Sequence, residues 1–226
     1  MERKIITTAD GSSTIYLPDL DETYHSRHGA IQEAIHVFIK SGLEFWLSKN
    51  PESHHLNILE IGFGTGLNAF LTCLQAEELQ CNIAYTGVEA YPVSQADLEH
   101  INYANEISSG TQESVFKKLH AVDWEILQDI TSRFKILKQE KTFADITDEA
   151  IHDLIYFDAF GPRVQPELWG ESVFNIMIKA LKPGGILVTY SAQGNARRAM
   201  QAVGFLVERI PGPPGKREML RARKPF

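Results

Sequence analysis

The chain has 226 residues, a hydrophobic fraction of 43%, a charged fraction of 23% and a net charge of -7. Such a chain accommodates one soluble α/β domain with a full core, but not two. The start Met-Glu-Arg-Lys lacks the apolar core of a signal peptide, no apolar run is long enough to span a membrane, and Cys73 and Cys81 show no metal spacing. We therefore expect a cytoplasmic protein without a membrane segment or a metal, and we treat it as a monomer.

The first 50 residues read as an extension that packs on a core domain of residues 51–226, the two forming a single structural unit. A β-hairpin over residues 3–17 is predicted to turn at Asp10-Gly11. After a polar stretch to His28, helical spacing of apolar residues begins at Ile31 and continues towards Leu47.

From residue 56 onwards, strands and helices alternate, which predicts an α/β, Rossmann-like domain with a seven-stranded, mostly parallel sheet. The predicted strands are 56–61, 83–88, 134–138, 154–157, 186–190, 205–210 and 217–223. The predicted helices are 67–79, 93–106, one from near Pro166 to the Lys182-Pro183-Gly184-Gly185 turn, and 195–203, with a long irregular region after residue 106.

A glycine-rich turn follows the first of these strands. Glu60 is followed by Gly62, Gly64 and Gly66 at alternate positions, and a helical pattern starts at once. A dinucleotide fingerprint would need glycine at 67, where the chain has leucine. The pattern instead resembles the first motif of class I S-adenosylmethionine (SAM) methyltransferases, in which the cofactor passes close to bare backbone. Taken alone, the turn is equally compatible with a purely structural role.

Two acidic residues downstream favour a nucleotide site. Glu89 ends the strand 83–88 and lies 23 residues beyond Gly66, where an acidic residue accepts hydrogen bonds from the ribose hydroxyls of an adenosine group. Asp145 follows the third strand, where class I methyltransferases often place an acidic residue against the adenine amino group. The alternatives are a solvated glutamate at a strand end and an ordinary loop aspartate.

A second motif, Asp158-Ala-Phe160-Gly-Pro, stands at the carboxyl end of the fourth strand. Methyl transfer to an amine needs a neutral nitrogen lone pair held about 3 Å from the methyl carbon. A carboxylate at this place can orient the amine and accept the proton that it loses, and Phe160 can pack against the substrate or the cofactor. The alternative for Asp158 is a cap that ends the strand.

Together with Tyr24–Phe38, Val88–Pro92, Pro166–Trp169, Thr189–Arg198 and Gly215–Met219, these motifs resemble the methyltransferase domain of the MnmC family, called MnmD when it stands alone. The resemblance implies SAM-dependent N-methylation of the aminomethyl group on a tRNA wobble uridine, which gives 5-methylaminomethyl-2-thiouridine. It implies a cofactor site formed by Glu60, Gly62, Gly64, Gly66, Asn68, Glu89 and Asp145. Asp158 and Phe160 would then face the amine, with Tyr24, Glu33 and Gln193 nearby.

The chain departs from the family pattern in three places. It has Val164-Gln165 where the family usually has Lys-Asn, and Ala144-Asp145-Ile146 where Gly-Asp-Ala is common, which weakens the adenine assignment. The flavin-dependent oxidase domain of many members does not follow before Phe226. We therefore expect the protein to act on tRNA that already carries a free aminomethyl group.

The charge distribution favours an RNA substrate despite the acidic total. Residues 197–226 contain eight Lys/Arg and two acidic residues, a local charge of +6, whereas the other 196 residues carry -13. A basic face on an acidic body can hold a phosphate backbone, and the predicted RNA contacts are Arg197, Arg198, Lys216 and Arg217. The alternative is a charged segment that only aids solubility.

These motifs are compatible with three functions. The preferred one is a tRNA wobble-uridine N-methyltransferase, and the alternative is a class I methyltransferase or aminopropyltransferase-like enzyme that acts on a small amine. A non-catalytic RNA- or nucleotide-binding module is the third. The intact set of Glu60, the three glycines, Glu89 and Asp158 disfavours it.

The glycine spacing makes a direct prediction about the cofactor. SAM should bind with micromolar-range affinity and NAD should not, because no glycine stands at 67. Gly64→Val should abolish SAM binding by placing a branched side chain where the cofactor passes. Isothermal titration calorimetry checks both statements, and tight NAD binding without SAM binding would contradict them.

Overall fold

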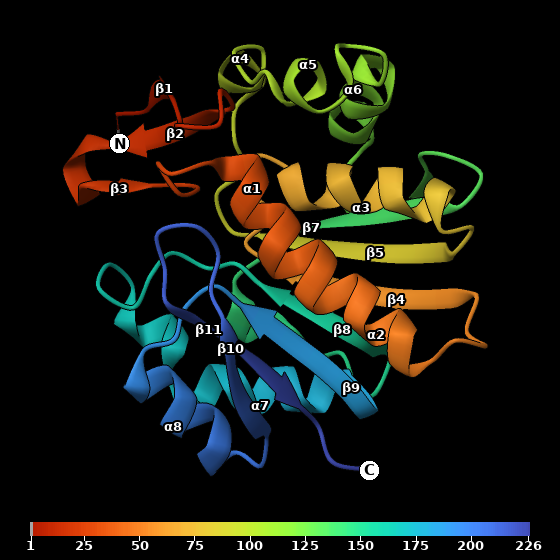
Figure 1. The fold of residues 1–226 in the computed structure, drawn as a ribbon, viewed down its shortest axis with the longest axis vertical. Coiled ribbons are helices and arrows are strands. Elements are labelled where there is room, and N and C mark those ends of the chain that lie inside the picture. Colours follow the sequence, from red (N-terminus) through yellow and green to blue (C-terminus); the bar gives the residue numbers. More distant parts are fainter. Residues whose placement is uncertain (1) are drawn as a thin grey trace.

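The strands form two sheets in the computed structural model, which describes residues 2–226 (Figure 1). A small antiparallel sheet has the order β1-β2-β3, and a large sheet has the order β10-β11-β9-β8-β4-β5-β7-β6. The small sheet consists of β1 (Lys4–Thr7), β2 (Ser13–Leu17) and β3 (Glu22–Thr23). The large one consists of β4 (His55–Ile61), β5 (Asn82–Glu89), β6 (Gln128–Asp129), β7 (Phe134–Glu140), β8 (His152–Phe157), β9 (Leu181–Thr189), β10 (Leu206–Pro211) and β11 (Glu218–Arg223).

The five central strands of the large sheet, β7, β5, β4, β8 and β9, run parallel, and antiparallel strands flank them on both sides. This arrangement confirms the predicted Rossmann-like class I methyltransferase plan. The two-residue strand β6 adds an eighth strand that the sequence did not predict. Because parallel neighbours end at the same edge, the residues that follow β4, β5 and β8 lie close together.

Helices cover both faces of the large sheet (Figure 1). The helical segments of the chain are α1 (Ala30–Ala34), the π-helical segment η2 (Ile35–Glu44), α2 (Phe45–Lys49), α3 (Leu67–Glu78), α4 (Gln95–Leu98), α5 (Tyr103–Ser108), α6 (Glu113–Ala121), α7 (Glu171–Ala180) and α8 (Gly194–Ala202). Short 3-10 turns span Pro18–Leu20, Phe143–Asp145 and Pro166–Trp169. None of these helices is long and apolar enough to cross a membrane, as far as residues 2–226 are concerned.

Alternation along the strands divides the core into two hydrophobic clusters, one on each face of the sheet. In β4, Ile58 packs with α1, η2, α3 and α6, whereas Leu59 packs with α7 and α8. Both residues are completely buried, as expected for a central parallel strand.

The helical part of the N-terminal extension is packed against the large sheet. The segments α1, η2 and α2 form one continuous helix, and η2 contacts β8 and β9. Gly42 permits this approach, because an added Cβ there would lie 3.1 Å from Val188 Cγ2 and 3.2 Å from Tyr156 Cε1. A larger residue at this position would force the helix away from the sheet.

Several predicted boundaries differ from the structure. The single helix predicted over 93–106 is two short helices, because Ser94 caps α4 and the chain turns before α5 begins at Tyr103. The segment expected to be irregular contains α6, which buries Phe116 and Leu119. The helix predicted from Pro166 starts only at Glu171, after a 3-10 turn.

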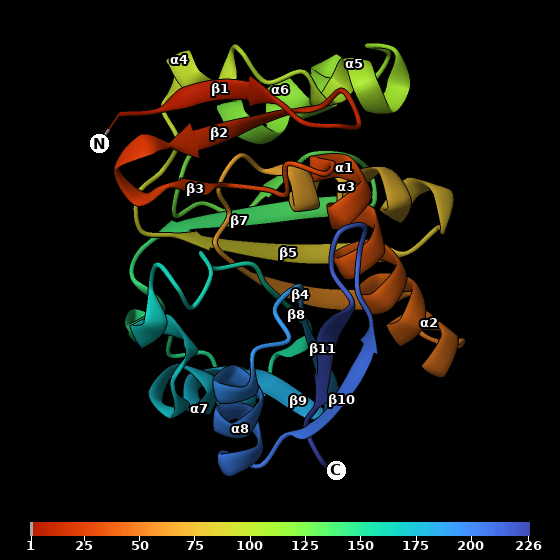
Figure 2. The same cartoon turned by 60° about the vertical axis from the view of Figure 1, so that its left-hand side comes forward.

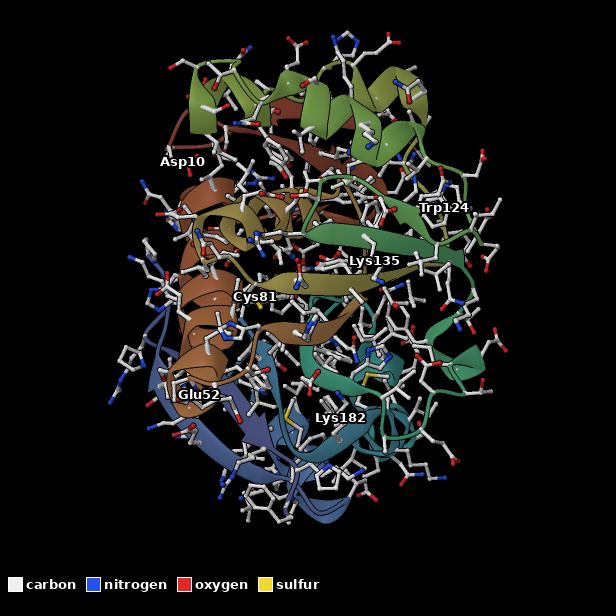
Figure 3. All side chains as sticks on the ribbon, turned by 90° about the vertical axis from the view of Figure 1, so that its right-hand side faces the viewer. Asp10, Glu52, Cys81, Trp124, Lys135 and Lys182 are labelled. Carbon is white, nitrogen blue, oxygen red and sulfur yellow. The ribbon has the colours of Figure 1, made fainter. Side chains whose placement is uncertain are left out.

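Aromatic packing near β7 helps to hold the glycine-rich turn. Figure 3 labels Lys135 on β7 and Trp124 near this strand. The Trp124 ring packs edge-on against Phe63, a residue of the glycine-rich turn, with ring centroids 6.1 Å apart. Phe63 also fills the space above Gly87, where an added Cβ would lie 2.5 Å from its ring. The position of the turn therefore depends on β5 as well as on β4.

Candidate active site

A cavity of about 410 Å³ lies at the carboxyl ends of β4, β5 and β8. The N-terminal segment 22–26 and α1 form part of its wall, and so does the loop between β10 and β11, which reaches α1 in Figure 2. The residues that were predicted for the site from the sequence and line this cavity are Tyr24, Glu33, Gly62, Gly64, Asn68, Glu89, Asp158, Phe160 and Lys216. The cavity is therefore built from both ends of the chain and from the centre of the sheet.

The glycine-rich turn forms the floor of this cavity. Gly62 and Gly64 have φ values of +86° and +51°, which favour glycine, and both line the cavity. An added Cβ at Gly62 would lie 2.7 Å from the carbonyl oxygen of Asp158, and one at Gly64 would lie 3.2 Å from the Tyr24 ring. Gly66, with a φ of +72°, begins α3 and faces His120 instead of the cavity.

Glu89 ends β5 at the rim of the turn. One carboxylate oxygen accepts a hydrogen bond from the Gly64 amide at 3.0 Å, and the other accepts one from the Tyr91 amide at 2.9 Å. Both oxygens keep further acceptor capacity on the cavity side. The carboxylate is thus fixed beside the glycines, where it can accept hydrogen bonds from a diol.

Asp145 does not line the cavity. Its side chain is exposed and accepts a hydrogen bond from the Thr142 hydroxyl at 2.6 Å. Thr142 and Phe143 form the cavity wall at this position. The structure therefore gives Asp145 a local role in shaping the 3-10 turn over Phe143–Asp145, and the ring of Phe143 offers the apolar surface for a flat base.

Asn68 joins two carboxyl groups beneath the cavity. Its Nδ2 donates to Glu60 Oε1 and to Asp158 Oδ2, each at 2.9 Å. Glu60 is only 1% exposed and does not line the cavity. Burial raises the pKa of Glu60 well above its usual range, and the nearby charge of Asp158 adds to this effect. Glu60 therefore supports the site from below, in an environment that disfavours its charged form.

Asp158, unlike Glu60, lines the cavity. Burial raises its pKa to about 7, the charge of Glu33 acts in the same direction, and the hydrogen bond from Asn68 and the charge of Lys216 oppose the rise. Its backbone amide donates to the Ile61 carbonyl at 2.9 Å, which fixes it next to the glycine turn. A carboxylate with a pKa near 7 can both accept and return a proton at neutral pH.

Aromatic rings surround the space above Asp158. Tyr24 and Phe160 pack edge to face with centroids 5.1 Å apart. The Tyr190 hydroxyl donates to the Ala159 carbonyl at 2.8 Å, which turns its ring towards the cavity. Electron-rich ring faces next to a carboxylate attract amines and other cationic groups.

Glu33 and Lys216 form an ion pair at the wall of the cavity. Lys216 Nζ lies 2.6 Å from Glu33 Oε1 and 3.9 Å from the centroid of the Tyr190 ring. The Ser26 amide donates to the other Glu33 oxygen at 2.9 Å. Lys216 was expected on the outer surface with Arg217, but the structure places it in the cavity.

The other predicted RNA contacts lie outside the cavity. Arg217 is exposed, Arg198 is exposed and donates to Asn195, and Arg197 is half-buried and donates to Gln201. Gln193, expected near the amine, is exposed and does not line the cavity.

Three of the eight basic residues in 197–226 are paired within the fold. Arg221 pairs with Glu208 at 2.6 Å, and Arg209 pairs with Glu218 at 3.5 Å. The local charge of +6 already counts these two glutamates, and the pairing of Lys216 with Glu33 takes one further cation from the expected basic face.

Sequence reasoning missed Tyr190, Thr142 and Ser26 as parts of the cavity wall. Tyr190 directly follows β9, so the rule that parallel strands end at one edge could have found it. Ser26 carries no such signal, because the chain folds back over the sheet to bring it there. No group of three or more His, Cys, Asp or Glu side chains within residues 2–226 is arranged to hold a metal ion.

The raised pKa of Asp158 predicts a pH dependence of stability. Its pKa is about 7 in the folded chain and 3.8 ordinarily, so its favourable contribution to stability is full below about pH 4 and is lost as pH rises through 7. Asp158→Asn should therefore gain stability relative to the wild type between pH 4 and pH 8, by a few kcal/mol. Urea unfolding across this range measures the difference, and a constant difference would contradict the assignment.

A model of a family described as S-adenosyl-L-methionine-dependent methyltransferase matches residues 104–225. Among solved structures, one titled MNMC2 from Aquifex aeolicus superposes with a TM-score of 0.80 at 22% identity, covering 100% of this chain and 72% of that one. A probable spermidine synthase from Corynebacterium glutamicum has a TM-score of 0.52 at 15% identity, covering 98% and 76%.

Two curated relatives are named tRNA 5-methylaminomethyl-2-thiouridine biosynthesis bifunctional protein MnmC. The one from Cupriavidus metallidurans is 31% identical over 96% of this chain and 33% of its own length. The one from Paraburkholderia xenovorans is 29% identical over 94% of this chain and 34% of its own length. The chain thus spans about a third of these relatives. By its matching family model, and in accord with its fold and its glycine-rich cavity, the chain belongs to the S-adenosyl-L-methionine-dependent methyltransferases.

Proposed function

We propose that the chain is a SAM-dependent N-methyltransferase that converts 5-aminomethyl-2-thiouridine to 5-methylaminomethyl-2-thiouridine at the tRNA wobble position, in the cytoplasm. The observation that carries this proposal is the position of Asp158, which faces a cavity with aromatic walls directly beside the glycine-rich turn. The names of the curated relatives support the tRNA substrate. Because the chain spans a third of those relatives, only the methylation is assigned to it.

The cavity residues fit SAM as the methyl donor. Gly62 and Gly64 leave bare backbone where a Cβ would collide with neighbouring atoms. Glu89 is fixed beside them to accept hydrogen bonds from the ribose. Asn68 lines the cavity next to the glycine-rich turn and offers a polar side chain there. When bound, SAM supplies a methyl group on a positively charged sulfur.

The residues around Asp158 prepare the amine for methylation. An alkylamine is protonated at neutral pH and has no free lone pair, so it must lose a proton before it reacts. Asp158 can accept this proton, and the hydrogen bond from Asn68 holds its carboxylate in place. The rings of Tyr24, Phe160 and Tyr190 exclude water and orient the aminomethyl group.

Exposed arginines near the cavity are suited to bind the tRNA backbone. Arg163 follows Phe160 and Gly161, is 61% exposed, and donates to the Asp21 carbonyl and to Glu22, which lines the cavity. Arg217 is the exposed neighbour of Lys216. Both are placed to contact phosphates while a flipped base enters the cavity.

Mass spectrometry of wobble nucleosides tests the proposed reaction. Undermethylated tRNA that carries the aminomethyl group should gain one methyl group when it is incubated with the protein and SAM. Asp158→Asn should slow turnover by about 10²–10⁴-fold with little change in SAM affinity, because it keeps the shape of the side chain but cannot accept the proton. Methylation of a small amine but not of tRNA would instead support the small-amine alternative.

The salt dependence of tRNA binding tests the role of Arg217. Arg217→Glu should raise the apparent KM for tRNA and lower the slope of log affinity against log salt by about 0.9 for a lost phosphate contact. SAM binding should not change. Lys179→Glu is the matched control, because Lys179 is an exposed cation at the end of α7 and does not line the cavity. An equal slope for both variants would exclude Arg217 from the RNA interface.

A further inference from the structure

Lys216 brings a positive charge into a cavity dominated by carboxyl groups. The loop that carries it is fixed against the N-terminal segment, since an added Cβ at Gly215 would lie only 2.5 Å from the His28 ring. Within the cavity, Lys216 Nζ contacts the Glu33 carboxylate at 2.6 Å and the face of the Tyr190 ring at 3.9 Å. The Lys216 side chain is 34% exposed and that of Glu33 is 10% exposed, so water screens this pair only in part.

The titratable groups around Asp158 come from six parts of the chain. They are Glu60 on β4, Glu33 on α1, Tyr190 after β9, Tyr85 on β5, Tyr103 on α5 and Lys216 on the loop between β10 and β11. In the N-terminal segment, His25 feels the charge of Glu33, and Glu22 raises the pKa of Tyr190. Lys216 is the cation among the groups that act on Asp158, and it lowers the pKa that burial and Glu33 raise.

A cation in this position acts on the substrate and on Asp158. It stabilises the ionised carboxylate of Asp158, and it repels an ammonium group that enters the same space. The first effect keeps Asp158 deprotonated and available as an acceptor but lowers its proton affinity, whereas the second lowers the proton affinity of the substrate amine. Transfer of one proton from the substrate ammonium to Asp158 leaves a neutral amine and a neutral carboxylic acid. No other co-reactant is needed for this step.

We propose that Lys216 is a positioning residue that, anchored on Glu33 and Tyr190, keeps Asp158 ionised and selects the neutral form of the substrate amine. The part that concerns the amine rests on the proposed methyltransferase function. The part that concerns Asp158 is a property of the protein alone and can be measured without substrate.

The substrate-free test is an NMR titration of the Asp158 side chain. Carbon-13 labelling of aspartate carboxyl groups, with Asp158→Asn to assign the signal, gives the pKa of Asp158 directly. Lys216→Met should raise this pKa by about one unit or more, because it removes the cation and leaves Glu33 without its partner. Lys216→Arg keeps the charge and should stay within about half a unit of the wild type.

Two further variants separate the charge effect from a purely structural one. Lys117→Met removes a lysine that is 73% exposed and paired with Glu113, so it should leave the Asp158 titration unchanged. The double variant Lys216→Met with Glu33→Gln removes both charges of the pair and should return the pKa towards the wild-type value. If Lys216→Met loses thermal stability but leaves the Asp158 titration unchanged, Lys216 only tethers the loop and the proposal is overturned.

The activity test uses aminomethyl-bearing tRNA over a range of pH. The acidic limb of kcat/KM should move to higher pH in Lys216→Met, which lowers the rate about tenfold at pH 6.5 for a shift of one unit. The rate should recover at high pH. An unshifted limb in an active variant would refute selection of the neutral amine. If the wild type itself does not methylate tRNA, the proposed function fails, and the NMR titration still decides the role of Lys216.

Discussion

The site depends on one electrostatic constraint, which is the burial of several carboxyl groups at the carboxyl edge of a parallel sheet. Glu60 and Asp158 end neighbouring strands and are linked through a single amide nitrogen of Asn68. Two charges this close cannot both persist in a poorly hydrated space. The two carboxyl groups differ in depth. Glu60 lies below the cavity, where burial raises its pKa well above the usual range, and Asp158 lines the cavity with a pKa of about 7.

This division explains why Asn68 stands at the start of α3. An amide nitrogen can donate to both carboxyl groups at once, whereas a charged donor would pull the pKa of both below neutrality. The glycine-rich turn passes close to Asp158, since a Cβ at Gly62 would collide with the Asp158 carbonyl. The helix α3 begins directly after this turn, which brings Asn68 near Asp158. Backbone geometry and proton chemistry are therefore set by the same few residues.

Gly62, Gly64, Glu89 and Asp158, which the sequence singled out, lie together at the cavity. The glycine spacing, Glu89 and Asp158 are local signals attached to strand ends, and the parallel sheet brings strand ends together by rule. Asp145 was harder to place, because the choice between Asp145 and Thr142 depends on a hydrogen bond within one short turn. The bounds of the helices α4 to α6 were not predicted correctly, because short helices give weak periodic signals.

The rest of the cavity could not be predicted because it depends on packing between distant parts of the chain. The charge pattern suggested that Lys216 belongs with Arg217 on the surface, but adjacent residues in a tight loop point in different directions. Glu33 and Lys216 are separated by most of the sequence and meet only because α1 and the loop between β10 and β11 lie side by side (Figure 2). A charge count made from the sequence cannot show which charged side chains are paired in the fold.

The two ends of the chain therefore contribute a different kind of specificity from that of the central sheet. Residues after β4 and β5 form a side of the cavity whose features, bare backbone and a fixed carboxylate, suit a nucleoside-bearing cofactor. Tyr24, Glu33 and Lys216 form another part of the wall, with an aromatic ring and an ion pair that suit an amine. A fold shared by many methyltransferases can keep the first side constant and change its substrate by changing the second. We therefore expect the N-terminal extension and the C-terminal hairpin to determine which substrate this chain accepts.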